Sequence, residues 1–481
     1  MGISSVFDIA SSGITAQRVA IEVTGENIAN VNTPGYSRQQ VIMENRPVTL
    51  ANGFGLGTGA QVATVRRSYD GMLQLQIVNG NSSYQENLAK QTALEQIEPS
   101  FNEVASDGLG KAVDNFFGAW QDLAANPSGS AERQALLSRS QILVDSFRQM
   151  DSSLGAVAQT ADNNLVGITA ELTDNARNLA LVNTQILGTQ AVGGNANELL
   201  DQRDLLIQKM ADKVGVTATL ASDGTASVTL PGGEQLVSGT RYATLYTNPT
   251  GVPPTNDIMI SGLGNPPPAN NPAGDTLVAT VGGGNALKGS LGGTLQIRDS
   301  IVPGYLAKLD EMAGELVSAV NAVQSAGYGL DGSTGNDFFD PAGVTSGTIA
   351  LDPALIAAKI GAALPTLSDP IPTSSGNNVN ALKIAAIKSS SVAFTTGGAT
   401  FGGFFRVMVG EVGIDTQGAQ NVTAQGAAFL KQLNALRSSN SAVSLDEELT
   451  NLTKYQRAFQ GSAKVINAAT DMLDIVLGMV R

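Results

Sequence analysis

Two short segments of this sequence have residue types and spacings that could bind a ligand. Gly55-Leu-Gly57 followed by Ala60 matches the glycine pattern of a dinucleotide-binding turn, but no helical pattern follows it to supply the phosphate-binding helix start. Asp331-Gly-Ser333 with Asp337 matches half of a calcium-binding loop, but Ala342 stands at the twelfth position, where that loop needs glutamate. We therefore interpret both segments as surface loops.

Carboxylates could supply acid–base chemistry, and three of them stand together at Asp446, Glu447 and Glu448. Ser444 and Glu447 have the spacing of a capping box, and anionic side chains are favoured at a helix start. The cluster is therefore interpreted as the start of a C-terminal helix. The enzymatic alternative is a cell-wall glycan hydrolase, which needs two carboxyl groups several ångströms apart in a cleft; the sequence singles out no such pair.

Composition excludes most other chemistry. The chain has no histidine and no cysteine, so imidazole and thiolate metal ligands, thiol nucleophiles and disulfides are absent. We expect no enzyme, no catalytic residue, no metal site and no cofactor. The net charge of −14 argues against nucleic acid as a partner, because phosphate contacts need clustered Lys and Arg.

No apolar run is long enough to span a bilayer, so no membrane span is predicted. The first basic residue is Arg18, and no purely apolar segment follows the start, which is unlike a secretory signal peptide. Any export should therefore use a route that cleaves no signal.

Both ends of the chain have the four-and-three spacing of helices that pack along their length. This spacing predicts one amphipathic helix before residue 31 and another from residue 452 to the end. The two stripes of large apolar side chains form what we call the assembly seam: Ile3, Phe7, Ile14, Ile21, Ile28, Val31, Leu452, Tyr455, Phe459, Ile466, Leu473, Val476 and Val480.

The predicted fold class is α + β multidomain. Terminal coiled-coil helices (1–35 with 444–481) enclose a helical domain with a β-hairpin (36–214 with 289–327 and 378–443). Short alternating runs and frequent Gly and Pro predict a β-rich inserted domain at 215–288. Residues 328–377 form either a second small insert or part of that β-rich domain.

The terminal helices should not be stable on their own. Burial of the seam side chains against each other offsets only part of the conformational entropy that two long helices lose on ordering. We therefore expect both helices to be disordered in the monomer and to fold when neighbouring copies supply more surface. The alternative is that both pack on the central helical layer.

The segment from Asn27 to Tyr36 is a helix stop and turn, since Pro34 bars continuation of the helix and Gly35 can take a positive φ. The string itself resembles the signature of the flagellar rod, hook and hook-associated protein family. The residues that carry this signature turn are Asn27, Asn30, Asn32, Pro34, Gly35 and Tyr36.

Other segments also resemble that family, most closely its hook-associated protein 1 branch: the continuation Tyr36-Ser-Arg-Gln39, then 197–204, 289–299 with 303–305, 309–321 and the final 449–480. They occur in the family's order and cover more than half of the chain. Gln324 departs from the branch, which often has a histidine there.

The resemblance implies a non-enzymatic flagellar subunit, found outside the cell, that joins hook to filament. It also implies the partners: further copies of the chain in a ring or helical assembly, the hook protein, the next hook-associated protein on the filament side, and an export chaperone on the C-terminal helix. Another axial protein, hook or distal rod, is the structural alternative.

Overall fold

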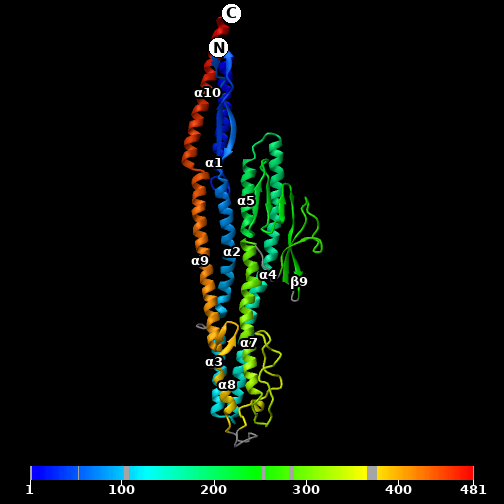
Figure 1. Ribbon diagram of the computed structural model, residues 1–481. Coiled ribbons are helices and arrows are strands. Elements are labelled where there is room, and N and C mark those ends of the chain that lie inside the picture. Colours follow the sequence, from blue (N-terminus) through cyan, green and yellow to red (C-terminus); the bar gives the residue numbers. More distant parts are fainter. Residues whose placement is uncertain are drawn as a thin grey trace.

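The computed structural model describes residues 3–51, 54–101, 108–251, 255–280, 287–365 and 376–479. The molecule is a long rod, with the N- and C-termini together at one end (Figure 1). That end is formed by α1 (Ile3–Ala29) and α10 (Leu445–Met479), which pack side by side. We call these two helices the terminal pair.

Long helices form the shaft of the rod. α2 (Gly71–Phe101) lies beside α9 (Phe401–Ser441), and α4 (Ser130–Ala191) runs back along the molecule. With 62 residues, α4 spans about 93 Å at 1.5 Å per residue. The shorter helices α3 (Leu109–Ala125) and α8 (Val379–Ile387) close the end opposite the termini.

The remaining helices lie between these. α5 (Asn197–Lys213) packs on α4 and α2, and α6 (Gly289–Gln296) continues through a π-helical turn, η1 (Ile297–Ile301), into α7 (Val302–Gln324). Pro303, which has no backbone N–H to donate, lies two residues after this π-helical turn, at the start of α7.

A β-hairpin lies along α1. Strands β1 (Gln39–Asn45) and β4 (Ala60–Arg67) pair antiparallel, and β2 (Thr49–Ala51) pairs with β3 (Phe54–Leu56) near the tip. The amide of Ala60 donates to Ser12 Oγ of α1 at 3.3 Å. Beside it, Gly59 has φ +106°, and a Cβ there would lie 2.0 Å from Ser12 Oγ, so this close approach requires glycine.

The β-rich insert projects from the side of α4 as two antiparallel sheets. The first orders β5 (Thr217–Leu220), β6 (Ala226–Thr229), β7 (Gln235–Ser238) and β8 (Arg241–Tyr242); the second orders β11 (Thr276–Ala279), β10 (Thr255–Ile260) and β9 (Leu245–Thr250). The small hairpin of β12 (Val392–Phe394) and β13 (Gly397–Ala399) precedes α9.

Two large apolar cores stabilise the shaft. One joins the insert to α4, α5 and α6, and the other fills the end formed by α3, α7, α8 and the start of α9. The second core holds an aromatic cluster in which Phe116 lies 5.8 Å from Phe338 and 5.7 Å from Phe339, measured between ring centroids. The described part of 328–377, with the short helix η2 (Ala357–Lys359), therefore packs at this end and not on the β sheets.

The α + β multidomain fold class predicted from the sequence is confirmed. Gly55-Leu-Gly57 is followed by strand β4, and not by a helix. The carboxylate of Asp331 accepts from the amide and the hydroxyl of Ser333 at 3.0 and 2.6 Å, which makes a local turn. Two of the Gly and Pro groups that led us to predict the β-rich insert, Pro253-Pro254 and Gly282-Gly-Gly284, lie outside the described residues.

Candidate assembly surface and polar joint

The terminal pair is held by close contact between α1 and α10. The two helices lie close together at Gly13, where an added Cβ would lie 2.9 Å from Ser462 Oγ. Ala16 and Ala20 of α1 and Ala469 of α10 are also small and buried. The pairing therefore depends on small residues as well as on the large side chains of the seam.

Most seam side chains stay incompletely buried in the single chain. Half-buried are Phe7, Ile14, Ile21, Ile28, Val31, Leu452, Tyr455, Phe459 and Ile466. Leu473 and Val476 are 39% and 48% exposed. The side chain of Ile3 and the whole of Val480 lie outside the described residues.

The far end of α10 presents apolar side chains to solvent. Nine large apolar residues of α10 are exposed, and six of them fall in the last eight described residues: Leu445, Leu449, Val465, Met472, Leu473, Ile475, Val476, Leu477 and Met479. Of the described side chains of α10, only Glu448 and Ala469 are fully buried. A helix in a finished monomer buries its apolar face, so this surface is incomplete in the single chain.

The signature turn connects the terminal pair to the shaft, and Asn27 is its central residue. Asn27 is 1% exposed, and its amide uses all of its hydrogen-bonding groups. Its Nδ2 donates to the Gln39 carbonyl at 2.8 Å and to Glu448 Oε2 at 3.1 Å. Its Oδ1 accepts from the Tyr36 hydroxyl and from the Gln39 amide, both at 2.9 Å. One side chain thus ties together α1, the turn, the hairpin and α10.

The other signature residues shape the turn. Asn30 donates to the Glu26 carbonyl at 3.1 Å and accepts from the Thr33 hydroxyl at 3.0 Å, which caps the end of α1. Gly35 has φ +86° and faces Leu205 of α5, so the left-handed conformation requires glycine. Asn32 and Pro34 are exposed.

An arginine clamps the start of α10 to the turn. Arg38 Nε donates to Glu448 Oε1 at 2.8 Å, and its Nη1 donates to Glu447 Oε2 at 2.7 Å. The sequence pattern predicted that Glu447 would cap its own helix, whereas its carboxylate accepts from Arg38, more than 400 residues away. The Arg38 amide also donates to the Ser441 carbonyl at 2.9 Å, which fixes the turn to the end of α9.

A second ionic group attaches the turn and hairpin to α5. Asp201 accepts from the Ser37 amide and from Arg67 Nη1, both at 2.8 Å. Arg67 Nη1 also lies 2.8 Å from Asp204 Oδ2. The other carboxylate oxygen of Asp204, Oδ1, pairs with Arg203 Nη2 at 2.7 Å. The side chains of Arg67 and Asp201 are less than 10% exposed. Buried charges with this many partners fix the geometry of the connection.

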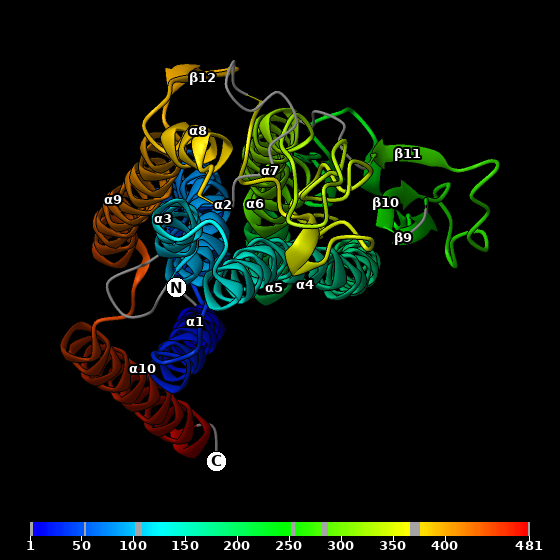
Figure 2. The same ribbon diagram turned by 90° about the horizontal axis from the view of Figure 1, so that it is seen from below.

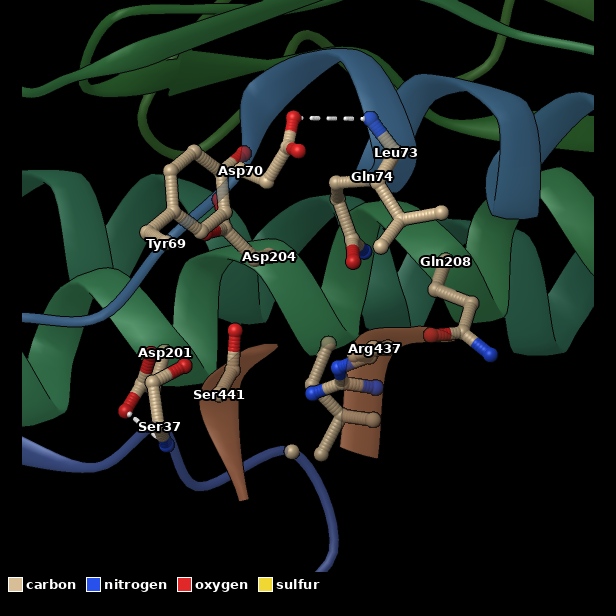
Figure 3. A pocket seen from close by; sticks show the side chains of 12 residues that line it. Ser37, Tyr69, Asp70, Leu73, Gln74, Asp201, Asp204, Gln208, Arg437 and Ser441 are labelled. Atoms are coloured by element: carbon tan, nitrogen blue, oxygen red, sulfur yellow. Dashed lines mark hydrogen bonds between the residues drawn. The ribbon is translucent and has the colours of Figure 1, made fainter. Parts of the chain in front are cut away.

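We call this group the polar joint: Asn27, Arg38, Arg67, Asp201 and Glu448. Among the residues that the structure describes, none of the four apolar clusters contains a residue of α1, of the hairpin or of α10. Beside the joint is a small, partly open cavity of about 20 Å³ lined by Ser37, Asp201, Asp204, Arg437 and Ser441, and also by Leu73 and Leu205 (Figure 3). A cavity of that size has room for about one water molecule.

Two carboxyl groups meet across the joint. Glu26 of α1 shares a hydrogen bond with Glu198 at the start of α5, which, with burial and the charge of Glu198, raises the pKa of Glu26 to about 7. Burial also raises the pKa of Asp201, although hydrogen bonds from Ser37 and Arg67 act in the opposite direction. The connection between terminal pair and shaft therefore contains a proton-binding site near neutral pH.

Sequence reasoning found the signature turn but missed its ionic partners. The segment 197–204 drew attention only through its resemblance, and its acidic residues lie against Arg67 and Ser37. Within the described ranges, no group of three or more acidic side chains could hold a metal ion. No described helix is both long and apolar enough to cross a bilayer.

Comparison with known families connects these features. Residues 94–339, just over half of the chain, match the flagellar hook-associated protein FlgK helical domain. Residues 7–36, which hold the seam residues from Phe7 to Val31 and the signature turn, match the flagella basal body rod protein family. Residues 435–479 match the C-terminal region of the flagellar basal body rod FlgEFG proteins.

Whole-length relatives carry related names. Flagellar hook-associated protein 1 of Bacillus subtilis is 28% identical, with 98% of this chain and 97% of the relative aligned. The protein of the same name from Salmonella typhimurium is 27% identical over 99% of this chain and 100% of the relative. The flagellar hook junction protein FlgK from Burkholderia pseudomallei, at 16% identity, has the same fold, with a TM-score of 0.64 over 77% of this chain and 100% of that one.

Proposed function

The chain belongs to the flagellar hook-associated protein FlgK family, and on that premise we propose that it is a structural subunit that assembles between hook and filament and joins them. The observation that carries this proposal is the terminal pair. α10 exposes nine large apolar side chains, and no described residue of the terminal pair belongs to any of the four apolar clusters. Such a surface needs neighbouring copies to complete its burial.

The seam and the signature turn have different roles in this assembly. The seam residues pair with axial neighbours, while the turn and the polar joint set the angle between terminal pair and shaft. In the free chain the two terminal helices are largely disordered, and they order when copies stack, because one pair buries too little of its seam to offset the entropy of ordering.

The partners are further copies of the chain, the hook protein on one side and the next hook-associated protein on the other. Before assembly, an export chaperone covers the C-terminal helix; the six exposed apolar residues near the end of α10 supply a suitable amphipathic surface. The protein works outside the cell, as part of the flagellum.

The chain has no catalytic activity in this proposal. The shifted carboxyl groups Glu26 and Asp201 are bound within the joint by Glu198, Ser37 and Arg67. Their contacts connect elements of the chain, which is what a structural role requires.

Electron microscopy of flagella from cells of the source bacterium that lack this chain tests the assignment. We expect hooks without filaments, with flagellin released into the medium, and restoration of filaments by the unaltered gene. Cells that still carry normal filaments on their hooks would refute the proposed junction role. Loss of the hook as well would place the chain at an earlier stage of the axial structure.

A further inference from the structure

The surface of α9 carries a row of exposed apolar side chains. Ile414 is 73% exposed, and Val422 and Phe429 are 47% and 51% exposed, although one edge of the Phe429 ring lies 3.6 Å from a Cβ placed at Gly80 of α2. The three residues are eight and seven positions apart, so they lie within one stripe about 80° wide on the helix. We call these three residues the ridge; Val407 and Leu436 extend it in both directions.

Charge is missing from this face. Between Thr416 and Leu430 the helix contains no charged residue. The two acidic residues that precede this uncharged stretch bind side chains of α7. Glu411 forms an ion pair with Lys308, and Asp415 accepts a hydrogen bond from the Tyr305 hydroxyl at 2.6 Å. An isolated helix on a protein surface normally has a polar outer face, so the ridge is suited to burial.

A groove with matching properties lies between α2 and α4, above α6. Its volume is about 520 Å³. The walls carry small or uncharged side chains: Leu88, Ala89 and Thr92 from α2, and Ala161, Gly167 and Ile168 from α4. Its only two charged lining residues, Lys213 and Glu171, pair with each other at 2.6 Å. The groove can therefore accept an apolar ridge without leaving a charge unpaired.

Ridge and groove lie at the same level of the rod. Gln420 of α9 donates to Glu95 of α2 at 3.1 Å, and Gly426 of α9 packs against Tyr84. These two contacts bracket the stretch of α2 that lines the groove, residues 85–96. From end on, α2 lies between α9 and α4 (Figure 2). The ridge and the groove are therefore on different faces of one molecule at one height.

Their lengths agree as well. Ile414 to Phe429 spans 15 residue steps, about 22 Å along a helix. The groove wall on α4 runs from Val157 to Glu171, which is about 21 Å. Matching length, height and lack of charge select a second copy of this chain as the occupant.

We propose that the ridge on α9 of one subunit packs into the α2–α4 groove of the subunit beside it. The contact joins two different surfaces, so it is head-to-tail and repeats around an axis, as a ring or helical assembly requires. The inference rests on the proposed function, because stacking of the terminal pairs is what brings the shafts side by side.

The absence of cysteine from the natural chain allows a direct test. Val422→Cys and Gly167→Cys are combined in the full chain, and flagella are isolated and oxidised. These two positions lie at about the same height of the rod, because Val422 falls between the Gln420 and Gly426 contacts with α2. Both tolerate the change, since Val422 is exposed and a Cβ at Gly167 meets nothing within 4 Å. We expect a ladder of cross-linked oligomers, and none from either single variant.

A control pair within one chain separates the possible failures. In Gly13→Cys/Ser462→Cys the two Cβ atoms would lie 3.7 Å apart, a separation that allows a disulfide. If the chain is present in the flagella and this control bond forms, but no 422–167 ladder appears, the ridge–groove contact is refuted and the junction role stands. Dimers from Val422→Cys alone would show ridge-to-ridge packing and also refute it. Absence of the unaltered chain from isolated flagella would overturn both proposals.

A substitution pair adds a functional readout. Ile414→Glu should lower incorporation into flagella at least tenfold, because it places an unpaired charge in the groove. Leu181→Glu, at a residue of α4 that is 50% exposed and does not line the groove, should change incorporation less than twofold. Equal incorporation of the two variants would contradict the proposal.

Discussion

Placing a carboxylate in the assembly seam should block incorporation and leave the soluble monomer almost unchanged. The change we choose is Phe459→Asp, at a half-buried position in the middle of α10. In the free chain, this residue belongs to neither of the two large apolar cores that stabilise the shaft. Its replacement therefore acts on a surface that only neighbouring copies complete.

The expected magnitudes differ strongly between the two states. In the assembly, loss of a buried phenyl ring costs about 2 kcal/mol, and a buried carboxylate without a partner adds several more. A total of at least about 4 kcal/mol per subunit corresponds to about a thousandfold weaker association. In the monomer, a substitution outside the cores changes stability by about 0.5 kcal/mol, which for a chain of 481 residues moves the thermal midpoint by only about 0.5 °C.

Two measurements decide the matter: calorimetry on the purified monomer, and the amount of chain recovered with isolated flagella. Gln456→Asp is the matched control, because it adds the same carboxylate at an exposed position of α10 three residues away. We expect the control to assemble and Phe459→Asp to be lost, with similar monomer midpoints. A drop of many degrees in the Phe459→Asp monomer would show that the seam belongs to the monomer's own core.

Three further predictions concern the joint and the shaft. Hydrogen exchange on the soluble chain should show fast exchange before Asn30 and after Leu452 and slow exchange in α4; strong protection of both ends would contradict disorder of the terminal helices. The pKa of Glu26 rises from 4.5 to about 7 in the docked joint, so the docked state holds the proton more tightly, and docking should weaken as pH rises through that range. Glu26→Gln should remove this dependence, measured as incorporation between pH 5 and pH 8, and a variant that keeps it would exclude Glu26 as the cause. Arg298→Met should cost about 3–5 kcal/mol in denaturant unfolding, because Asp162 and Asp299 lose their buried counter-charge, whereas Arg177→Met, with an exposed partner, should cost less than about 1 kcal/mol.

Helix ends were predictable where glycine and proline act locally. The sequence Asn126-Pro-Ser-Gly-Ser130 predicts a helix break, and it separates α3, which ends at Ala125, from α4, which begins at Ser130. Val192-Gly-Gly-Asn195 predicts another, and α4 ends just before it at Ala191; the signature turn likewise follows Ala29. Proline removes a backbone N–H and glycine lowers helix propensity, so such breaks can be predicted without knowledge of distant contacts. The same reasoning predicts a break near Pro99 and is wrong there, because α2 continues through Pro99 to Phe101.

The polar joint was not predictable by the same means. Arg38 and Glu448 are 410 positions apart, and each has an ordinary local interpretation. Glu447 and its neighbours suit a helix start whether or not an arginine lies opposite. The π-helical turn at Ile297–Ile301 also gives no local signal, because its Arg298 is positioned by Asp162 on another helix. Contacts of this kind depend on the tertiary fold.

The polar character of the joint explains how the two ends of the chain can order late. A hydrogen bond lost to water costs only about 1 kcal/mol net, because water replaces the partner, whereas exposure of an apolar interface costs in proportion to its area. Arg38, Asn27 and Asp201 can therefore release the terminal pair without opening either large core. An apolar joint would instead fold the terminal helices onto the shaft of a single chain and cover the seam before a neighbour arrives. With a polar joint, the shaft of the single chain can stay folded while the terminal helices become ordered only when the next copy packs against them.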